Sequence, residues 1–130
     1  MKKTITIEGS SIHDIHSFYQ EINRVFMEGE DWKIGDSLDA FDDLLYGGFG
    51  ALDGDAPVTL EWKDIGISRT TLGMDATREY YQQKLLPGSP FNRVAFTLKL
   101  TELNEGRGQT YFDIILEIIS RHRNIRLVQG

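Results

Sequence analysis

Hydrophobic residues recur along the chain at two spacings, which separate predicted strands from predicted helices. Residues 4–7, 58–62 and 125–128 are short, apolar or β-branched segments next to turn-forming residues, and we expect them to be strands. From Ile12 to Phe26 apolar residues recur every three or four positions, which predicts a helix with one buried face. Ser11 and Asp14 resemble a capping box at its start. A shorter helix is expected after an N-cap at Ser37.

The second half of the chain has one clear helix and two weaker patterns. Thr110 and Asp113 form a capping motif before a helix over residues 111–119 that is apolar around most of its circumference. Residues 71–86 have a weakly amphipathic helical pattern. Residues 93–100 alternate apolar and polar side chains, which predicts an edge strand or hairpin arm with one face in water.

The order of these elements predicts the fold class. A strand, then helices, then a second strand is the βαβ arrangement, which predicts parallel pairing. The 130 residues, of which 40% are hydrophobic and 26% charged, fit one compact core. We therefore expect a single α/β domain over residues 1–130.

Negative charge is concentrated in one part of the chain. The net charge is −6, yet residues 28–55 alone hold nine carboxylates and one lysine. On a helical wheel Asp39, Asp43 and Tyr46 lie opposite the apolar side of the helix after Ser37, and Asp36 lies on their side if the helix extends that far. An acidic face can simply be solvated, but it can also bind a basic protein. Direct binding to nucleic acid is disfavoured, since that requires a basic surface.

Two other side chains are candidates for a partner contact. Glu117 lies on the narrow polar side of the helix over residues 111–119, although pairing with Arg121 four positions later could also explain it. Trp32 lies in the acidic loop and could be either an interface anchor or a core residue.

Several chemistries lack the residues they need. The chain has no cysteine, no phosphate-binding loop and no nucleophile elbow. His13 and His16 are interpreted as surface histidines, and we expect no metal, no cofactor and no catalysis, with a carboxylate-pair hydrolase ranked last. No apolar run could cross a membrane, and the start does not resemble a signal peptide, so we expect a cytoplasmic protein.

Two segments together resemble the barstar family of intracellular ribonuclease inhibitors. They are the run 35–41 (Gly-Asp-Ser-Leu-Asp-Ala-Phe) with Asp43 after it, and the run 57–62 (Pro-Val-Thr-Leu-Glu-Trp). The resemblance extends over residues 2 to about 68 and resumes from about 111 to 129. The chain differs from the family member compared at Lys33, Ser37, Gly48 and Arg121.

The resemblance implies a small three-stranded parallel sheet packed with helices. Residues 69–102 would then be an insertion that contains the weak helix and the edge strand. The resemblance also implies that an acidic helix enters the active site of a ribonuclease. By position it assigns partner contacts to Asp39, Asp43, Gly47 and Glu117.

We therefore expect an immunity-type inhibitor of a basic ribonuclease or nuclease toxin. Its acidic helix would imitate nucleic-acid phosphates and occlude the active site. The alternative is an acidic module that binds a partner other than a nuclease through the same face. The candidate contacts are Asp36, Ser37, Asp39, Asp43, Tyr46, Gly47, Trp32 and Glu117.

Overall fold

A parallel β-sheet forms one side of the molecule. The computed structural model describes residues 3–130. Within that range β1 (Lys3–Glu8), β2 (Val58–Lys63) and β3 (Ile125–Gln129) form one sheet in the order β1-β2-β3, and both pairings are parallel. The register places Ile5, Leu60 and Leu127 in one row across the sheet. The expected α/β class with a three-stranded parallel sheet is confirmed.

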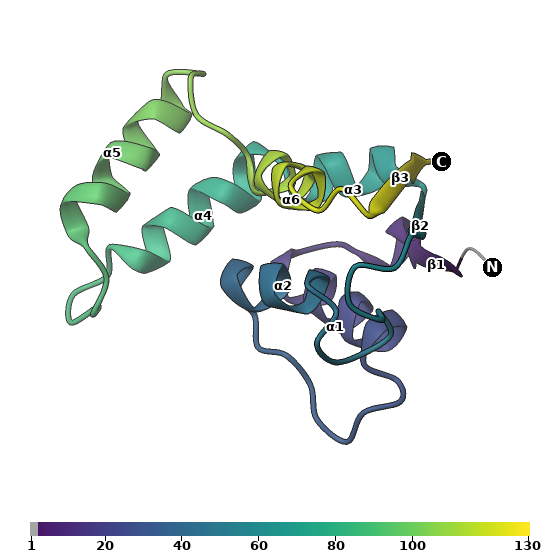
Figure 1. The fold of residues 1–130 in the computed structure, drawn as a ribbon. Helices are drawn as coiled ribbons and strands as arrows, with labels where there is room; N and C mark the ends of the chain where they lie inside the picture. The colour runs from purple at the N-terminus through teal and green to yellow at the C-terminus, as the bar shows by residue number, and fades with distance from the viewer. Residues whose placement is uncertain (1–2) are drawn as a thin grey trace.

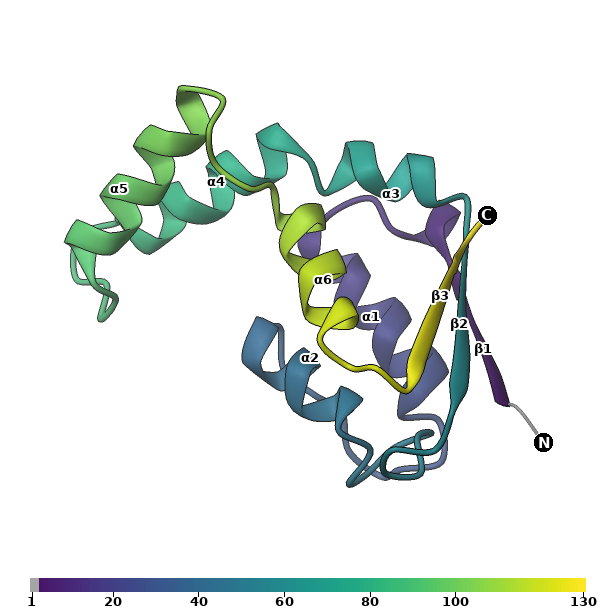
Figure 2. The same cartoon turned by 45° about the horizontal axis from the view of Figure 1, so that its top comes forward.

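The helices cover only one face of this sheet. Their bounds are α1 (Ile15–Phe26), α2 (Leu38–Leu45), α3 (Ile65–Thr71), α4 (Met74–Lys84), α5 (Arg93–Asn104) and α6 (Tyr111–Ser120), with a short 3₁₀ turn η1 (Gly9–Ser11). Figure 2 shows α1, α2 and α6 on the same side of the strands. Ile5 and Ile7 are buried beneath them, whereas Thr4 is exposed. The uncovered face explains why the strands alternate instead of being apolar throughout, as is usual in parallel sheets.

Trp62 joins the sheet to the helices above it. Its ring stacks on Phe18 of α1 with centroids 6.0 Å apart and meets Phe112 of α6 edge-on at 5.7 Å. Its indole Nε1–H donates to Ser68 Oγ of α3 at 3.0 Å, so the polar atom of a fully buried side chain is satisfied.

Local capping fixes where the helices begin. Ser37 Oγ accepts from the Ala40 amide at 3.2 Å, and Thr110 forms a capping box with Asp113, as predicted. The predicted box at Ser11 is wrong. Ser11 belongs to η1, and Asp14 is the N-cap of α1, with its carboxylate accepting from the Ser17 amide at 2.7 Å. The backbone of Asp14 is still extended, so α1 cannot begin earlier.

The predicted edge strand over residues 93–100 is also wrong, because these residues form the first two turns of α5. Asn92 Oδ1 accepts from the Ala95 amide at 3.0 Å and begins the helix. Phe96 packs toward Tyr81 of α4 with ring centroids 6.0 Å apart, and Leu103, seven positions further on, is fully buried. Packing against α4 therefore selects a helical face, and the alternation between polar and apolar residues is incidental.

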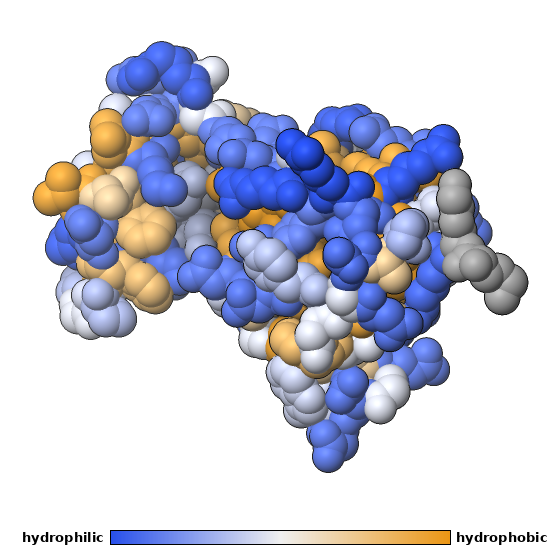
Figure 3. Space-filling model, viewed as in Figure 1, coloured by the Kyte–Doolittle hydropathy of each residue, from blue (hydrophilic) through white to orange (hydrophobic). Residues whose placement is uncertain are grey.

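Helices α4 and α5 form an arm that extends away from the sheet, as Figure 1 shows. The expected weak helix is confirmed as α4, with shorter bounds, and α3 is a further helix that the pattern did not predict. Apolar side chains gather at the left-hand end of Figure 3, where the arm lies. The exposed ones there include Leu86, Phe91, Val94 and Leu98.

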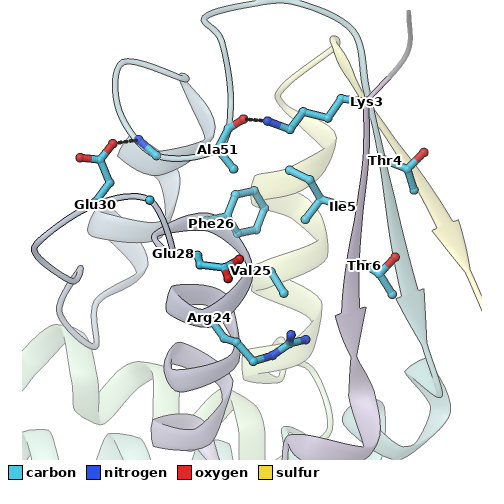
Figure 4. A pocket seen from close by; sticks show the side chains of 12 residues that line it. Lys3, Thr4, Ile5, Thr6, Arg24, Val25, Phe26, Glu28, Glu30 and Ala51 are labelled. Carbon is cyan, nitrogen blue, oxygen red and sulfur yellow. Dashed lines mark hydrogen bonds between the residues drawn. The ribbon is translucent and has the colours of Figure 1, made fainter.

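The loop after α2 is fastened to the edge of the sheet. A hollow of about 550 Å³ lies beside β1. Figure 4 shows the side chains that line it and the hydrogen bond from Lys3 Nζ to the Ala51 carbonyl. On the opposite rim Glu30 accepts from the Gly50 amide at 3.2 Å. These contacts hold the middle of the connection between α2 and β2, at Gly50 and Ala51, close to the body of the molecule.

The helical assignment of α5 predicts unequal effects of two leucine substitutions. Leu103→Ala should lower the free energy of unfolding by about 2–5 kcal/mol, the usual cost of emptying a buried leucine site. Leu98→Ala should change it by less than about 0.5 kcal/mol, because 56% of Leu98 is exposed. Urea denaturation of both variants measures this. Equal losses would contradict the orientation of α5.

Candidate partner-binding surface

The segment that leads into α2 is held in place by one side chain of α1. Asn23 Oδ1 accepts from the Ile34 amide at 2.9 Å, and Asn23 Nδ2 donates to the Ile34 carbonyl at 3.2 Å. Both backbone groups of Ile34 are thereby satisfied. Ser37 then caps α2, so the position and direction of this helix are fixed from its first turn.

Helix α2 is buried along one side and acidic along the other. Phe41, Leu44 and Leu45 are buried, and the Phe41 ring meets Phe18 edge-on with centroids 5.4 Å apart. Asp39 and Asp43 are both exposed, four positions apart on the same side of the helix. Neither carboxylate forms a hydrogen bond or ion pair with any other residue in the range 3–130. The helix thus presents two carboxylates with no internal partner.

Asp42 has a different environment from its two neighbours. Its Oδ1 lies 2.7 Å from Nε2 of His122, a residue only 7% exposed that follows α6. The Tyr46 ring meets His122 edge-on with centroids 4.7 Å apart, while 65% of Tyr46 stays exposed. The contacts of His122 with Asp42 and Tyr46 connect α2 to the end of α6. Asp42 therefore has a partner within the fold of residues 3–130, which Asp39 and Asp43 lack.

Two further acidic candidates are already paired. Asp36 Oδ2 lies 2.6 Å from His16 Nδ1, and the hydrogen bond from Asp36, followed by its charge, raises the pKa of His16. Glu117 accepts from Gln109 Nε2 at 2.8 Å and from Arg121 at 3.0 Å, and these two hydrogen bonds lower the pKa of Glu117. Asp36 and Glu117 are therefore less available to a partner than the α2 pair.

The aromatic and glycine candidates flank α2. Trp32 packs against Phe49 with ring centroids 4.9 Å apart and is 45% exposed, so it is partly supported and partly open to a partner. Gly47 has a φ of +80°, and a Cβ there would lie 2.4 Å from the Gly54 carbonyl oxygen. The Gly54 amide donates to Gly47 O at 2.9 Å. The turn itself thus requires glycine at position 47.

Sequence reasoning missed both histidine contacts. His122 lies 80 residues from Asp42, and no local pattern connects them. One signal existed, because Asp42 follows the buried Phe41 and lies near the apolar edge of the helix, where a carboxylate needs a partner. His16 does lie on the surface, as predicted, but its contact with Asp36 depends on how the loop folds back.

A family model described as barstar, the barnase inhibitor, matches residues 2–83. The chain belongs to the barstar family. The matched range includes Asp36, Asp39 and Asp43 and ends within α4, so Glu117, α5 and α6 lie beyond it. No curated protein matches the chain.

Barstar family members act as inhibitors. Among residues 3–130 no group of three or more His, Asp or Glu side chains is arranged to hold a metal ion. No helix in that range is both long and apolar enough to cross a membrane.

The contact between His16 and Asp36 can be tested by titration. Because the pKa of His16 is raised in the folded state, the pair stabilises the fold at low pH, and this contribution falls as the pH rises through that pKa. Nuclear magnetic resonance should show the His16 ring titrating above its ordinary value of about 6.5. In Asp36→Asn the pKa should return toward that value. A His16 pKa unchanged by this substitution would contradict the contact.

The contrast between Asp42 and Asp43 predicts unequal losses of stability. Asp42→Ala should lower the free energy of unfolding by about 1–3 kcal/mol, because it leaves the buried His122 ring nitrogen without its partner. Asp43→Ala is the matched control and should stay within about 0.5 kcal/mol, since its carboxylate is exposed. Urea denaturation at neutral pH distinguishes the two. Similar values for both variants would show that the His122 contact does not anchor α2.

Proposed function

We propose that this protein inhibits a basic ribonuclease by occluding its active site with the exposed side of α2. Asp39 and Asp43 supply carboxylate oxygens where the enzyme would bind phosphate, and arginine or lysine side chains of the enzyme donate to them. Asp36, Ser37, Trp32, Tyr46, Gly47 and Glu117 surround this contact. The protein acts in the cytoplasm and catalyses no reaction of its own.

One observation carries the proposal. Asp39 and Asp43 are exposed without an internal partner, on a helix whose opposite side is buried. Two like charges four positions apart cost an exposed helix about 0.2–0.5 kcal/mol, so the pair does not serve the fold. A cationic partner removes that repulsion on binding. Membership of a family of ribonuclease inhibitors supports a ribonuclease as this partner.

The two types of acidic side chain have different roles in the complex. Asp39 and Asp43 can accept the enzyme's donors without giving up an existing hydrogen bond. Asp36 and Glu117 first have to share or exchange theirs with His16, Gln109 or Arg121. We therefore assign most of the binding free energy to Asp39 and Asp43, and a supporting contribution to Asp36 and Glu117.

Rigidity of the helix adds to affinity. The apolar contacts of α2 and the bond between Asp42 and His122 hold its carboxylates in place before binding. Little conformational entropy is then lost when the complex forms. The local excess of negative charge steers a basic enzyme toward this face, and added salt screens that attraction.

Inhibition of RNA cleavage tests the proposal. The enzymes assayed are barnase and the ribonuclease that copurifies with the tagged chain from its own cells, each with and without the purified full-length protein. Asp43→Ala should weaken the inhibited complex by at least about 2 kcal/mol, or about 30-fold in Kd, the threshold for an interface hot spot. The association rate of the unmodified chain should fall steeply as salt is raised.

Asp75→Ala is the control, because it removes one fully exposed carboxylate from a different helix and should change the Kd less than twofold. Full activity of every ribonuclease in the presence of excess protein would refute the proposal. Binding of a partner without nuclease activity, lost in Asp43→Ala, would instead favour a general acidic interaction module.

A further inference from the structure

A groove lies beside the start of α2, between the beginning of α1 and helix α4. Its volume is about 480 Å³. One wall contains Ile15, His16 and Asp36, and the other contains Glu79 and Tyr80 of α4. Asp36 immediately precedes the N-cap of α2, so the groove continues from the acidic face of that helix.

The charged groups that line the groove leave it acidic. Asp14, Asp36 and Glu79 supply three carboxylates, against the ammonium of Lys84 and the ring of His16, whose pKa is raised by its hydrogen bond to Asp36. The Lys84 Nζ lies 3.7 Å from the centroid of the Phe91 ring and 5.0 Å from that of Tyr80. The ammonium group is therefore held against these two aromatic rings. Asp14 is occupied in capping α1. Glu79 forms no ion pair or side-chain hydrogen bond with any residue in the range 3–130.

The lining as a whole fits a long cationic side chain. Ile15, Tyr80 and Phe91 offer apolar surface for the methylene stem of an arginine or lysine. Glu79 offers a carboxylate to its charged end, whereas Asp36 would have to share its hydrogen bond with His16. A ligand with the same negative charge as α2, such as an acidic peptide or a phosphate, would be repelled by the three carboxylates.

The α4 wall is fixed before any partner binds. Thr77 Oγ1 accepts from the Tyr111 amide at 2.7 Å, and the Phe112 amide donates to Leu72 O at 3.1 Å. The Tyr80 ring meets Tyr111 edge-on with centroids 5.1 Å apart. Tyr80 is also within electrostatic reach of α2, because its pKa is raised by burial and then by the charge of Asp39. The groove and the exposed side of α2 therefore form one continuous, preorganised surface.

We propose that this groove is a second contact site for the ribonuclease and receives an arginine or lysine side chain of that enzyme. The inference rests on the proposed function and extends the interface from α2 onto α4. It gives the arm a role in binding, with Glu79 as the residue that pairs with the incoming cation.

Glu79→Gln tests the groove, and Asp75→Asn is its matched control. Both substitutions remove one exposed carboxylate from α4, but only Glu79 lines the groove. Calorimetry against the ribonuclease inhibited in the assay above should give about a tenfold loss of affinity for Glu79→Gln, as expected for a charged hydrogen bond, and less than a twofold loss for Asp75→Asn. Equal losses of affinity in the two variants would contradict the proposal that the groove contacts the ribonuclease.

The results separate failure of the groove from failure of the function. If Asp43→Ala abolishes inhibition while Glu79→Gln binds like Asp75→Asn, inhibition through α2 is supported and the groove is refuted as a second contact site. If no ribonuclease is inhibited, the groove is tested without an enzyme. N-acetyl-arginine amide titrated into the full-length protein should then give saturable resonance shifts at Glu79 and Tyr80 that are absent in Glu79→Gln. N-acetyl-glutamine amide should give none. Absence of shifts with the arginine derivative would overturn the inference.

Discussion

The packing of α2 against the core determines what the acidic surface can be. Phe41, Leu44 and Leu45 are buried, and their burial fixes the rotation of the helix about its axis. Asp39 and Asp43 are then held in solvent. Rotation by a single residue, about 100°, would bring charge toward the core, where an unpaired carboxylate is strongly unfavourable. The hydrophobic effect thus orients the electrostatic surface.

The acidic residues of this region divide into three groups by what surrounds them. Asp42 serves the fold through the buried His122. Asp36 and Glu117 lie at the surface but have polar partners of their own. Asp39 and Asp43 have none within the described residues. Composition cannot make this division, because all five are carboxylates within an acidic protein, and only their neighbours differ.

The arm of α4 and α5 changes the expected shape of the surface. The sequence pattern predicted an edge strand or hairpin arm over residues 93–100. Instead Phe96 and Leu103 face inward on a helix, and α4 is fastened to α6 through Thr77. Residues of α4 consequently lie beside Asp36 and form one wall of the groove.

The sequence by itself determined the parallel sheet, the helices α1, α2 and α6, and the shared face of Asp39 and Asp43. These features follow from local periodicity, capping and charge, which act over a few residues and can be read along the chain. Tertiary structure alone decided that residues 93–100 are helical, that His122 anchors Asp42, and that α4 lies beside Asp36. These outcomes depend on contacts between segments far apart in the chain, such as the 80 residues between Asp42 and His122. Weak local preferences cannot fix such contacts, because burial and pairing with distant groups outweigh them.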